Sequence, residues 1–271
     1  MPDGIEAGGG DAAVARVARL TLYPVKSLDG QRVETATVLP SGALDHDRVY
    51  ALHDAEGRIL NAKRQPALQR LRTRVDLAAG ILSLGEAGDR TFDLASERDA
   101  FEAEIGAAIG TPVHLRDNRV TGFPDDLASP GPTVVSTATL MEVAGWFALT
   151  LDDMRARLRA NVEVDGVPPF WEDRLFGGRE DETVAFRAGP VALLGVNPCL
   201  RCAVPTRDPR TGAPDPDFAA RFTERREHTL PDWAPRGRFR PFYRVAVNTR
   251  RDRASARDRA ALRVGDAVSL V

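Results

Sequence analysis

The sequence is poor in several features, and each scarcity excludes a class of protein. Two cysteines lie too close together to form more than a strained disulfide, which favours free thiols in a reducing compartment. Thirty-seven Lys and Arg residues nearly balance thirty-nine Asp and Glu residues, so no global basic field argues for nucleic acid or an anionic membrane. No stretch approaches the roughly 18 apolar residues of a membrane span. We therefore expect a cytoplasmic globular protein with a small ligand and neither a nucleic-acid nor a membrane partner.

Both cysteines fall in one Cys-x-x-Cys run, Cys199-Leu200-Arg201-Cys202, which concentrates the sulfur chemistry in one loop. A structural zinc site would need four ligands, but there is no second cysteine pair and the four histidines are scattered. A thioredoxin-like dithiol would begin a βαβ unit, whereas this pair lies late in the chain between β-like segments. The third use is a single thiolate that holds a soft transition metal whose other ligands come from an organic cofactor. We favour this third use, and the other two stay open.

The hydrophobic pattern predicts an α+β fold, mainly β, with a barrel-like antiparallel core. A capping box of Ser96 and Asp99 predicts a helix that ends at Gly110. Further helices are expected over residues 137–147 and, behind a Thr150 cap, over 151–158. Short segments of alternating or β-branched residues predict the strands. They cover residues 19–23, 33–38, 48–52, 71–75, 81–84, 90–94, 161–164, 183–186, 191–194, 243–247 and 267–271.

A polar stretch over residues 118–132, with three prolines and two glycines, is the best candidate for a boundary between two modules. The Gly- and Asp-rich start of the chain has neither the basic nor the apolar region of a signal peptide. We therefore expect a flexible tail over residues 1–13, a β-barrel-like N-terminal module over 14–118 and a C-terminal domain over 119–271.

Cations at two expected strand ends could form an anion pocket. Lys26 and Ser27 offer an ammonium and a hydroxyl together, and Arg48 supplies a guanidinium at the start of the next strand. A charge at the end of a strand is often only solvated. A cofactor held at the cysteine loop, however, would need such groups to grip its phosphate.

Five ordered motifs give the chain, from about Val17 to its end, a resemblance to a known family. They are Tyr23-Pro24-Val25-Lys26-Ser27, Asp47-Arg48, Ala62-Lys63-Arg64-Gln65-Pro66, Arg159-Ala160-Asn161 and the run from Cys199 to Gly212. The sequence resembles proteins with a molybdenum cofactor sulfurase C-terminal (MOSC) domain behind an N-terminal barrel module, such as the mitochondrial amidoxime-reducing components and their bacterial relatives. The resemblance implies an antiparallel β-barrel MOSC domain as the C-terminal domain. One departure is Ala160, where the family usually has proline, and this costs only local stiffness.

The resemblance implies a molybdenum cofactor, Mo-molybdopterin, and assigns a role to each motif residue. Cys202 corresponds to the catalytic residue and the thiolate ligand of the metal, whereas Cys199 is not assigned to the metal. An Asn that opens a strand can also be only a turn residue, and Ser136 is expected to be a helix cap. The implied cofactor contacts are Lys26, Ser27 and Arg48 at the pterin phosphate, with Arg159 and Asn161 as further contacts.

The implied reaction is the reductive removal of oxygen from a small N-hydroxylated substrate, which converts N–OH to N–H. A plant-type [2Fe–2S] centre needs four thiolates and this chain has two, so the electrons would come from an external ferredoxin, flavodoxin or cytochrome b5-type protein. Two alternatives stay open: a persulfide relay on Cys202 and a cofactor carrier without turnover. The run Trp171-Glu172-Asp173 either shapes substrate access or forms a packed turn.

Overall fold

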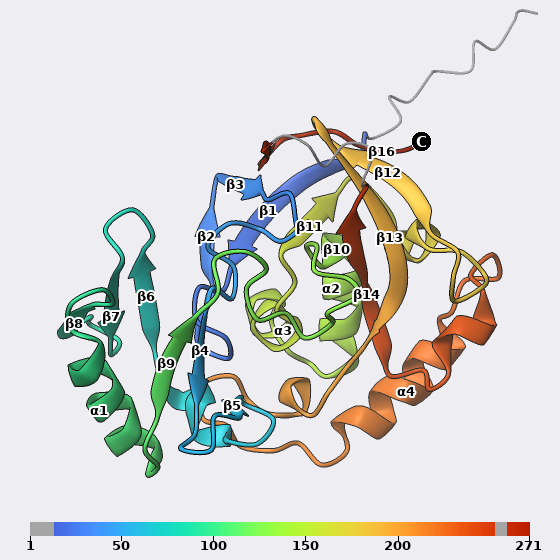
Figure 1. Ribbon diagram of the computed structural model, residues 1–271. Coiled ribbons are helices and arrows are strands. Elements are labelled where there is room, and N and C mark those ends of the chain that lie inside the picture. The colour runs from blue at the N-terminus through green and yellow to red at the C-terminus, as the bar shows by residue number, and fades with distance from the viewer. Residues whose placement is uncertain (1–13, 253–258) are drawn as a thin grey trace, which may run out of the picture.

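The computed structural model describes residues 14–252 and 259–271, so the tail expected over residues 1–13 lies outside the described residues. The described residues form sixteen β-strands, four α-helices and four short 3₁₀ helices (Figure 1). This confirms the expected mainly β chain with a few packed helices. No helix in these two ranges is both long and apolar enough to cross a membrane.

An eight-stranded sheet joins strands from both ends of the chain, in the order β16-β12-β13-β14-β10-β11-β1-β2. Its pairs are antiparallel except β10 and β11, which run parallel. An isolated bridge joins Arg16 of β1 to Ala267, just before β16. Backbone hydrogen bonds from Val17 to Asp266 at 2.8 Å and from Val268 to Ala15 at 2.7 Å link the same two segments. The expected antiparallel core is therefore found as a mainly antiparallel eight-stranded sheet, and its closure into a barrel stays a prediction. The strands are β1 (Arg16–Leu22), β2 (Gln31–Val33), β10 (Val134–Ser136), β11 (Val162–Asp165), β12 (Val184–Ala188), β13 (Val191–Leu200), β14 (Arg244–Arg251) and β16 (Val268–Leu270).

Three smaller sheets complete the β structure. A two-stranded sheet pairs β3 with β15, and two three-stranded sheets have the orders β5-β4-β9 and β6-β7-β8. The antiparallel pairing of β7 and β8 confirms the hairpin expected from the turn at residues 85–89. The strands are β3 (Thr35–Val38), β4 (Tyr50–His53), β5 (Ile59–Leu60), β6 (Thr73–Asp76), β7 (Ile81–Leu84), β8 (Arg90–Asp93), β9 (His114–Asp117) and β15 (Ala260–Arg263).

Strands from the two modules expected from the sequence pair with one another in the same sheets. β1 pairs with β11, and β3 pairs with β15 near the other end of the chain. The start of the chain therefore contributes to the same sheets as the C-terminal half, and the boundary expected after residue 118 stays a prediction. In Figure 1 the blue strands β1 and β3 accordingly lie against yellow-green and red segments.

The helices are α1 (Arg98–Ile109), α2 (Thr137–Trp146), α3 (Leu151–Leu158) and α4 (Phe218–His228). The caps of α2 and α3 follow the predictions: Ser136 accepts from the Thr139 N–H, and Thr150 forms a capping box with Asp153. The box expected at Ser96 is wrong, because the Ser96 hydroxyl donates to Asp93 and the cap of α1 makes no side-chain bond.

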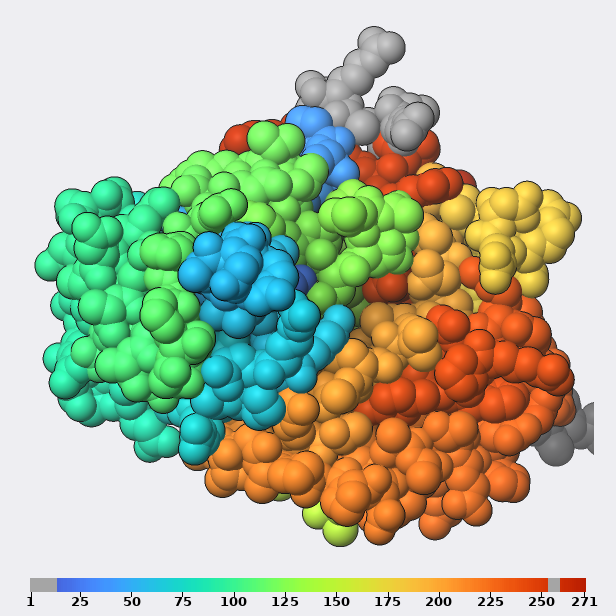
Figure 2. All heavy atoms as spheres, turned by 60° about the horizontal axis from the view of Figure 1, so that its bottom comes forward, coloured from blue at the N-terminus to red at the C-terminus, as the bar shows by residue number. Residues whose placement is uncertain are grey.

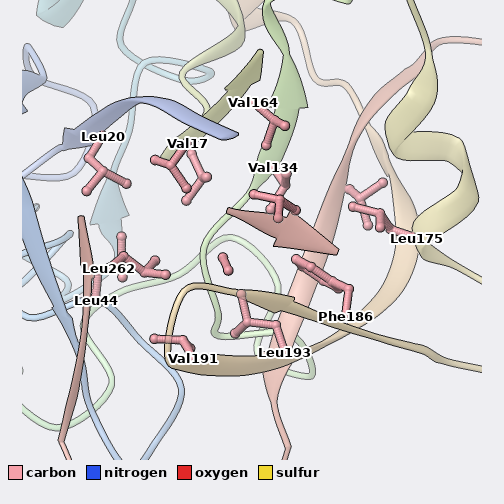
Figure 3. Close-up of a cluster of buried hydrophobic side chains, with 14 of the residues drawn as sticks. Val17, Leu20, Leu44, Val134, Val164, Leu175, Phe186, Val191, Leu193 and Leu262 are labelled. Atoms are coloured by element: carbon pink, nitrogen blue, oxygen red, sulfur yellow. The ribbon is translucent and has the colours of Figure 1, made fainter. Parts of the chain in front are cut away.

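Hydrophobic side chains of the eight-stranded sheet form the central core. Figure 3 shows Val17 and Leu20 of β1 facing Val134, Phe186 and Leu193 from β10, β12 and β13. A second core lies beneath α1, and a third packs α2, α3 and α4 together.

Candidate functional site

A cavity of about 710 Å³ brings together all six site residues expected from the sequence. Its walls come from the turn after β1, the segment before β4, the loop over residues 121–133, the end of α3 and the end of β13. Figure 2 shows this face hollowed between the blue-to-cyan N-terminal segments, the light-green loop and the orange-to-red C-terminal half. A continuous cavity therefore joins the cysteine loop to the cations near the N-terminus. The six residues are Lys26, Ser27, Arg48, Arg159, Asn161 and Cys202.

Lys26 is buried directly after β1, and its ammonium already faces an anion. Its Nζ donates to the Phe123 carbonyl oxygen and to the Asp125 carboxylate, both at 2.8 Å. Burial lowers the pKa of Lys26 below its usual value, against the opposing effect of Asp125. The neighbouring Ser27 has a left-handed backbone (φ 74°), and its hydroxyl accepts from the Ala62 N–H at 3.1 Å.

Arg48 is held by an ion pair and an aromatic ring. Its guanidinium contacts the Asp47 carboxylate and lies 5.0 Å from the centroid of the Tyr23 ring. Burial works against the charge, but Asp47 raises the pKa of Arg48 above its ordinary value. Asp47 is itself fixed, because it also accepts from the Tyr23 N–H at 2.8 Å. Arg48 is therefore a permanent, pre-oriented cation in the cavity wall.

Arg159 approaches the same ring from the end of α3. It is the C-cap of that helix and adopts a left-handed backbone (φ 53°), so its side chain leaves the helix axis toward Tyr23. Its guanidinium carbon lies 4.2 Å from the Tyr23 centroid, and its Nη2 donates to the Leu28 carbonyl oxygen at 2.7 Å. Burial lowers the pKa of Arg159. Tyr23 thus supports both Arg48 and Arg159, a role that its place in the first motif could have suggested.

Asn161 is buried with its side-chain amide fully bonded. Its Nδ2 donates to the Thr21 carbonyl oxygen and to Asp47, both at 3.0 Å. Its Oδ1 accepts from the Thr133 N–H at 3.2 Å and from Arg48 at 3.4 Å. An amide has two donors and accepts about two bonds, so a direct contact with a ligand would require one of these bonds to break. In this arrangement Asn161 positions Asp47 and Arg48.

The two cysteines are free thiols, each partly exposed, and both line the cavity. β13 extends to Leu200, beyond the expected end at residue 194, so Cys199 is the penultimate residue of this strand. The Cys202 sulfur accepts from the Val204 N–H at 3.5 Å, and the Tyr243 hydroxyl donates to the Cys202 carbonyl oxygen at 3.3 Å. Within residues 14–252 and 259–271, no three His, Cys, Asp or Glu side chains gather in a group able to hold a metal.

The cavity is strongly cationic although the whole chain carries a formal charge of -2. Its lining holds twice as many cationic side chains as carboxylates. Of these cations, the sequence predicted only Lys26, Arg48 and Arg159 as ligand contacts. The buried Nε atoms of Arg157, Arg201 and Arg244 have no hydrogen-bond partner among the described residues. This charge distribution suits a ligand with several negative charges. The cations are Lys26, Arg48, Lys63, Arg72, Arg157, Arg159, Arg201, Arg238, Arg240 and Arg244; the carboxylates are Asp29, Asp47, Asp125, Asp126 and Glu180.

The run Trp171-Glu172-Asp173 does not line this cavity. It forms a 3₁₀ helix, η2 (Trp171–Leu175), in which Glu172 and Asp173 are almost fully buried. Asp173 forms an ion pair with the buried Arg226 of α4. The packed-turn interpretation is therefore correct, and the suggestion that this run shapes substrate access is wrong.

Comparison with known protein families places this fold and cavity in a class. The model of the MOSC N-terminal beta barrel domain matches residues 14–152, and that of the MOSC domain matches residues 133–269. The chain therefore belongs to the MOSC family, whose domains are linked to binding of the molybdenum cofactor.

Individual relatives are more distant. The crystal structure of APC1665, the YuaD protein from Bacillus subtilis, is similar to this chain with a TM-score of 0.43 and 15% sequence identity. The match covers 94% of each chain. No curated protein matches the sequence.

Proposed function

We propose that this protein binds the molybdenum cofactor in the cationic cavity and reduces small N-hydroxylated compounds, converting N–OH to N–H. The observation that carries the proposal is the continuity of one cavity from the partly exposed Cys202 thiol to the Lys26, Arg48 and Arg159 cluster. Membership of a family linked to this cofactor supports the same assignment.

The residues of the cavity fit such a cofactor. Cys202 would hold the metal, and the cations at the far wall would hold the phosphate. Unpartnered buried guanidinium nitrogens and an excess of positive charge are what an anionic ligand would satisfy. When bound, the cofactor would supply oxygen-atom transfer coupled to a two-electron redox change.

The chain's own residues orient and tune the bound group. Because Arg48 and Arg159 are already held over Tyr23, they need little reorganisation to meet a phosphate. The Val204 N–H donates to the Cys202 sulfur at 3.5 Å, and this contact helps to orient the sulfur. Two cysteines cannot hold a four-thiolate iron–sulfur centre, so we place the electron donor outside the chain, in a ferredoxin, flavodoxin or cytochrome b5-type protein.

The proposal is tested by turnover of chemically reduced protein. Full-length chain from a host that makes the cofactor is reduced with dithionite without oxygen and offered benzamidoxime. We expect benzamidine to form in proportion to the molybdenum bound, with Cys199→Ser as an active control. Cyanide-releasable sulfur in protein without molybdenum would instead indicate a persulfide relay. Bound molybdenum without any turnover would indicate a carrier.

A further inference from the structure

The C-terminal wall of the cavity carries cations of its own, separate from the cluster around Lys26. Arg238 belongs to the 3₁₀ helix η4 (Arg236–Phe239), Arg240 follows this helix, and Arg244 opens β14. All three side chains line the cavity. In the β13–β14 register Arg244 lies opposite Leu200, so this wall stands next to the cysteine loop.

The bonds of Arg238 and Arg244 fix the positions of these two side chains without neutralising their charge. Arg244 donates to the Pro198 carbonyl oxygen at 3.0 Å and to that of Arg240 at 3.4 Å. Arg238 donates to the carbonyl oxygens of Gly177 at 2.7 Å and Val196 at 3.0 Å. Carbonyl oxygens are neutral acceptors, so these hydrogen bonds do not neutralise the positive charges. The Nε of Arg244 is buried without a partner in the described part of the chain.

The segments before residue 130 differ, because each of their cations that line the cavity has a carboxylate partner, whereas Arg159 of the α3 end has none. Arg48 pairs with Asp47, and Arg72 lies 3.4 Å from Asp29. Lys26 and Lys63 share Asp125. Arg238, Arg240 and Arg244 form no ion pair with any described carboxylate, although Glu180 lines the same cavity. Guanidinium groups that line one cavity repel one another unless an anion lies among them.

We propose that Arg240 and Arg244, supported by Arg238, form a second oxyanion subsite that binds a carboxylate or phosphate of the molecule in the cavity. This inference rests on the proposed function, which identifies the molecule in the cavity as the cofactor or its substrate. The anionic group belongs either to the substrate or to a nucleotide that extends the cofactor. In both cases the cavity has two separated anion sites, one at Lys26 and one beside the cysteine loop.

Titration of the full chain with inorganic phosphate at low ionic strength tests the subsite without any turnover. Arg240 is exposed and its guanidinium forms no hydrogen bond or ion pair with the described residues, so we expect Arg240→Gln to preserve the fold. We expect two classes of phosphate site in the wild type. Arg240→Gln and Arg244→Gln each weaken one class about tenfold, because a charge-assisted hydrogen bond is lost, and Lys26→Met weakens the other.

The control is Arg225→Gln, which removes the same charge from an exposed position of α4 outside the cavity. It should leave both phosphate affinities unchanged. A single class of site that Lys26→Met abolishes and Arg240→Gln leaves intact would overturn the subsite. This result is independent of whether the chain reduces any compound, so the two proposals can fail separately.

Two measurements on the holoenzyme identify the source of the anionic group. If the substrate supplies it, Arg240→Gln raises KM for benzamidoxime bearing a 4-carboxylate about tenfold more than it raises KM for benzamidoxime. If the cofactor supplies it, acid hydrolysis of the wild type releases a nucleotide, and Arg240→Gln lowers cofactor retention. The same ratio of the two KM values in the variant and in the wild type, with no nucleotide and an unchanged phosphate titration, would contradict the subsite.

Discussion

Asp125 stands where an anionic ligand of Lys26 would bind. Its carboxylate lies 2.8 Å from the Lys26 ammonium and 3.7 Å from that of Lys63. The Asp125 side chain is 61% exposed whereas that of Lys26 is 7% exposed, so the carboxylate lies on the open side of the ammonium. Burial opposes its ionisation, but Lys26 holds the pKa of Asp125 well below its usual range. Asp125 therefore competes as an anion with any phosphate that approaches Lys26.

Removing this competing charge should strengthen anion binding at Lys26. We expect Asp125→Asn to bind inorganic phosphate about tenfold more tightly, because the phosphate no longer displaces a carboxylate from a buried cation. Asp126→Asn is the matched control, since Asp126 lines the same cavity and makes no ion pair with Lys26 or Lys63. Calorimetric titration measures both. Unchanged or weaker binding by Asp125→Asn would show that the carboxylate supports the site.

The sequence selected residues that share one cavity, but it did not predict their contacts. Motif spacing was enough to select Lys26, Arg48 and Cys202, which the fold brings into one cavity. The bonding of Asn161 could not be foreseen, because its partners come from segments up to 140 residues away. The arginines of the C-terminal wall were missed for a related reason: a charged residue near a chain turn is ordinarily solvated.

At the scale of single elements, β13 positions the cysteine loop. Gly195 lets this strand approach the backbone of Leu175 in η2 closely. A Cβ atom at residue 195 would lie 1.7 Å from the Leu175 carbonyl oxygen and 2.7 Å from its carbon, both backbone atoms. The β13–β14 register also shifts between Gly195 and Asn197. The strand therefore needs a residue without a side chain at this irregularity.

Gly195→Ala should destabilise the fold and displace the end of β13. We expect the free energy of unfolding to fall by roughly 3 kcal/mol, the upper range for overpacking a well-packed interior. Gly178→Ala serves as control, because nothing lies within 4 Å of a Cβ at that position. Urea denaturation compares the two. Equal stabilities would contradict the close approach to Leu175.

Elements with strong local signals were predicted well, and those set by tertiary packing were not. The capping residues of α2 and α3 mark their starts, and the hairpin of β7 and β8 follows its turn. α4 was missed because its buried face is Phe218, Phe222 and Arg226, and an arginine interrupts the apolar spacing. The parallel pairing of β10 with β11 requires the crossover through α2 and α3. The local sequence of either strand does not predict this pairing.

At the scale of the whole molecule, Glu172 couples stability to pH. It is fully enclosed between η2 and α2, where one carboxylate oxygen accepts from the Thr139 hydroxyl at 3.0 Å. Its other oxygen is buried without a partner among the described residues. Burial, with the nearby Asp173 carboxylate, raises the pKa of Glu172 to about 7. Arg226 is paired with Asp173 and so leaves Glu172 without a cation of its own.

The folded chain thus holds a proton on Glu172 more tightly than the unfolded chain does. The stabilising contribution is fully present below the unfolded pKa of about 4.5 and is lost as pH rises through about 7. We expect the loss of stability between pH 4 and pH 9 to be smaller by roughly 3 kcal/mol in Glu172→Gln than in the wild type. Glu224→Gln, at an exposed position of α4, is the control. Parallel pH profiles for wild type and Glu172→Gln in urea denaturation would contradict this assignment.

The central claim is that Cys202 ligates the metal of a cofactor held in the cationic cavity. Its most direct test is elemental analysis of full-length wild type, Cys202→Ser and Cys199→Ser, each purified from a host that makes the molybdenum cofactor. We expect molybdenum or tungsten in the wild type and in Cys199→Ser, and a loss of most of that metal in Cys202→Ser, because serine is a harder and poorer ligand than thiolate. Full retention of the metal by Cys202→Ser, or a wild type without either metal, would contradict the account.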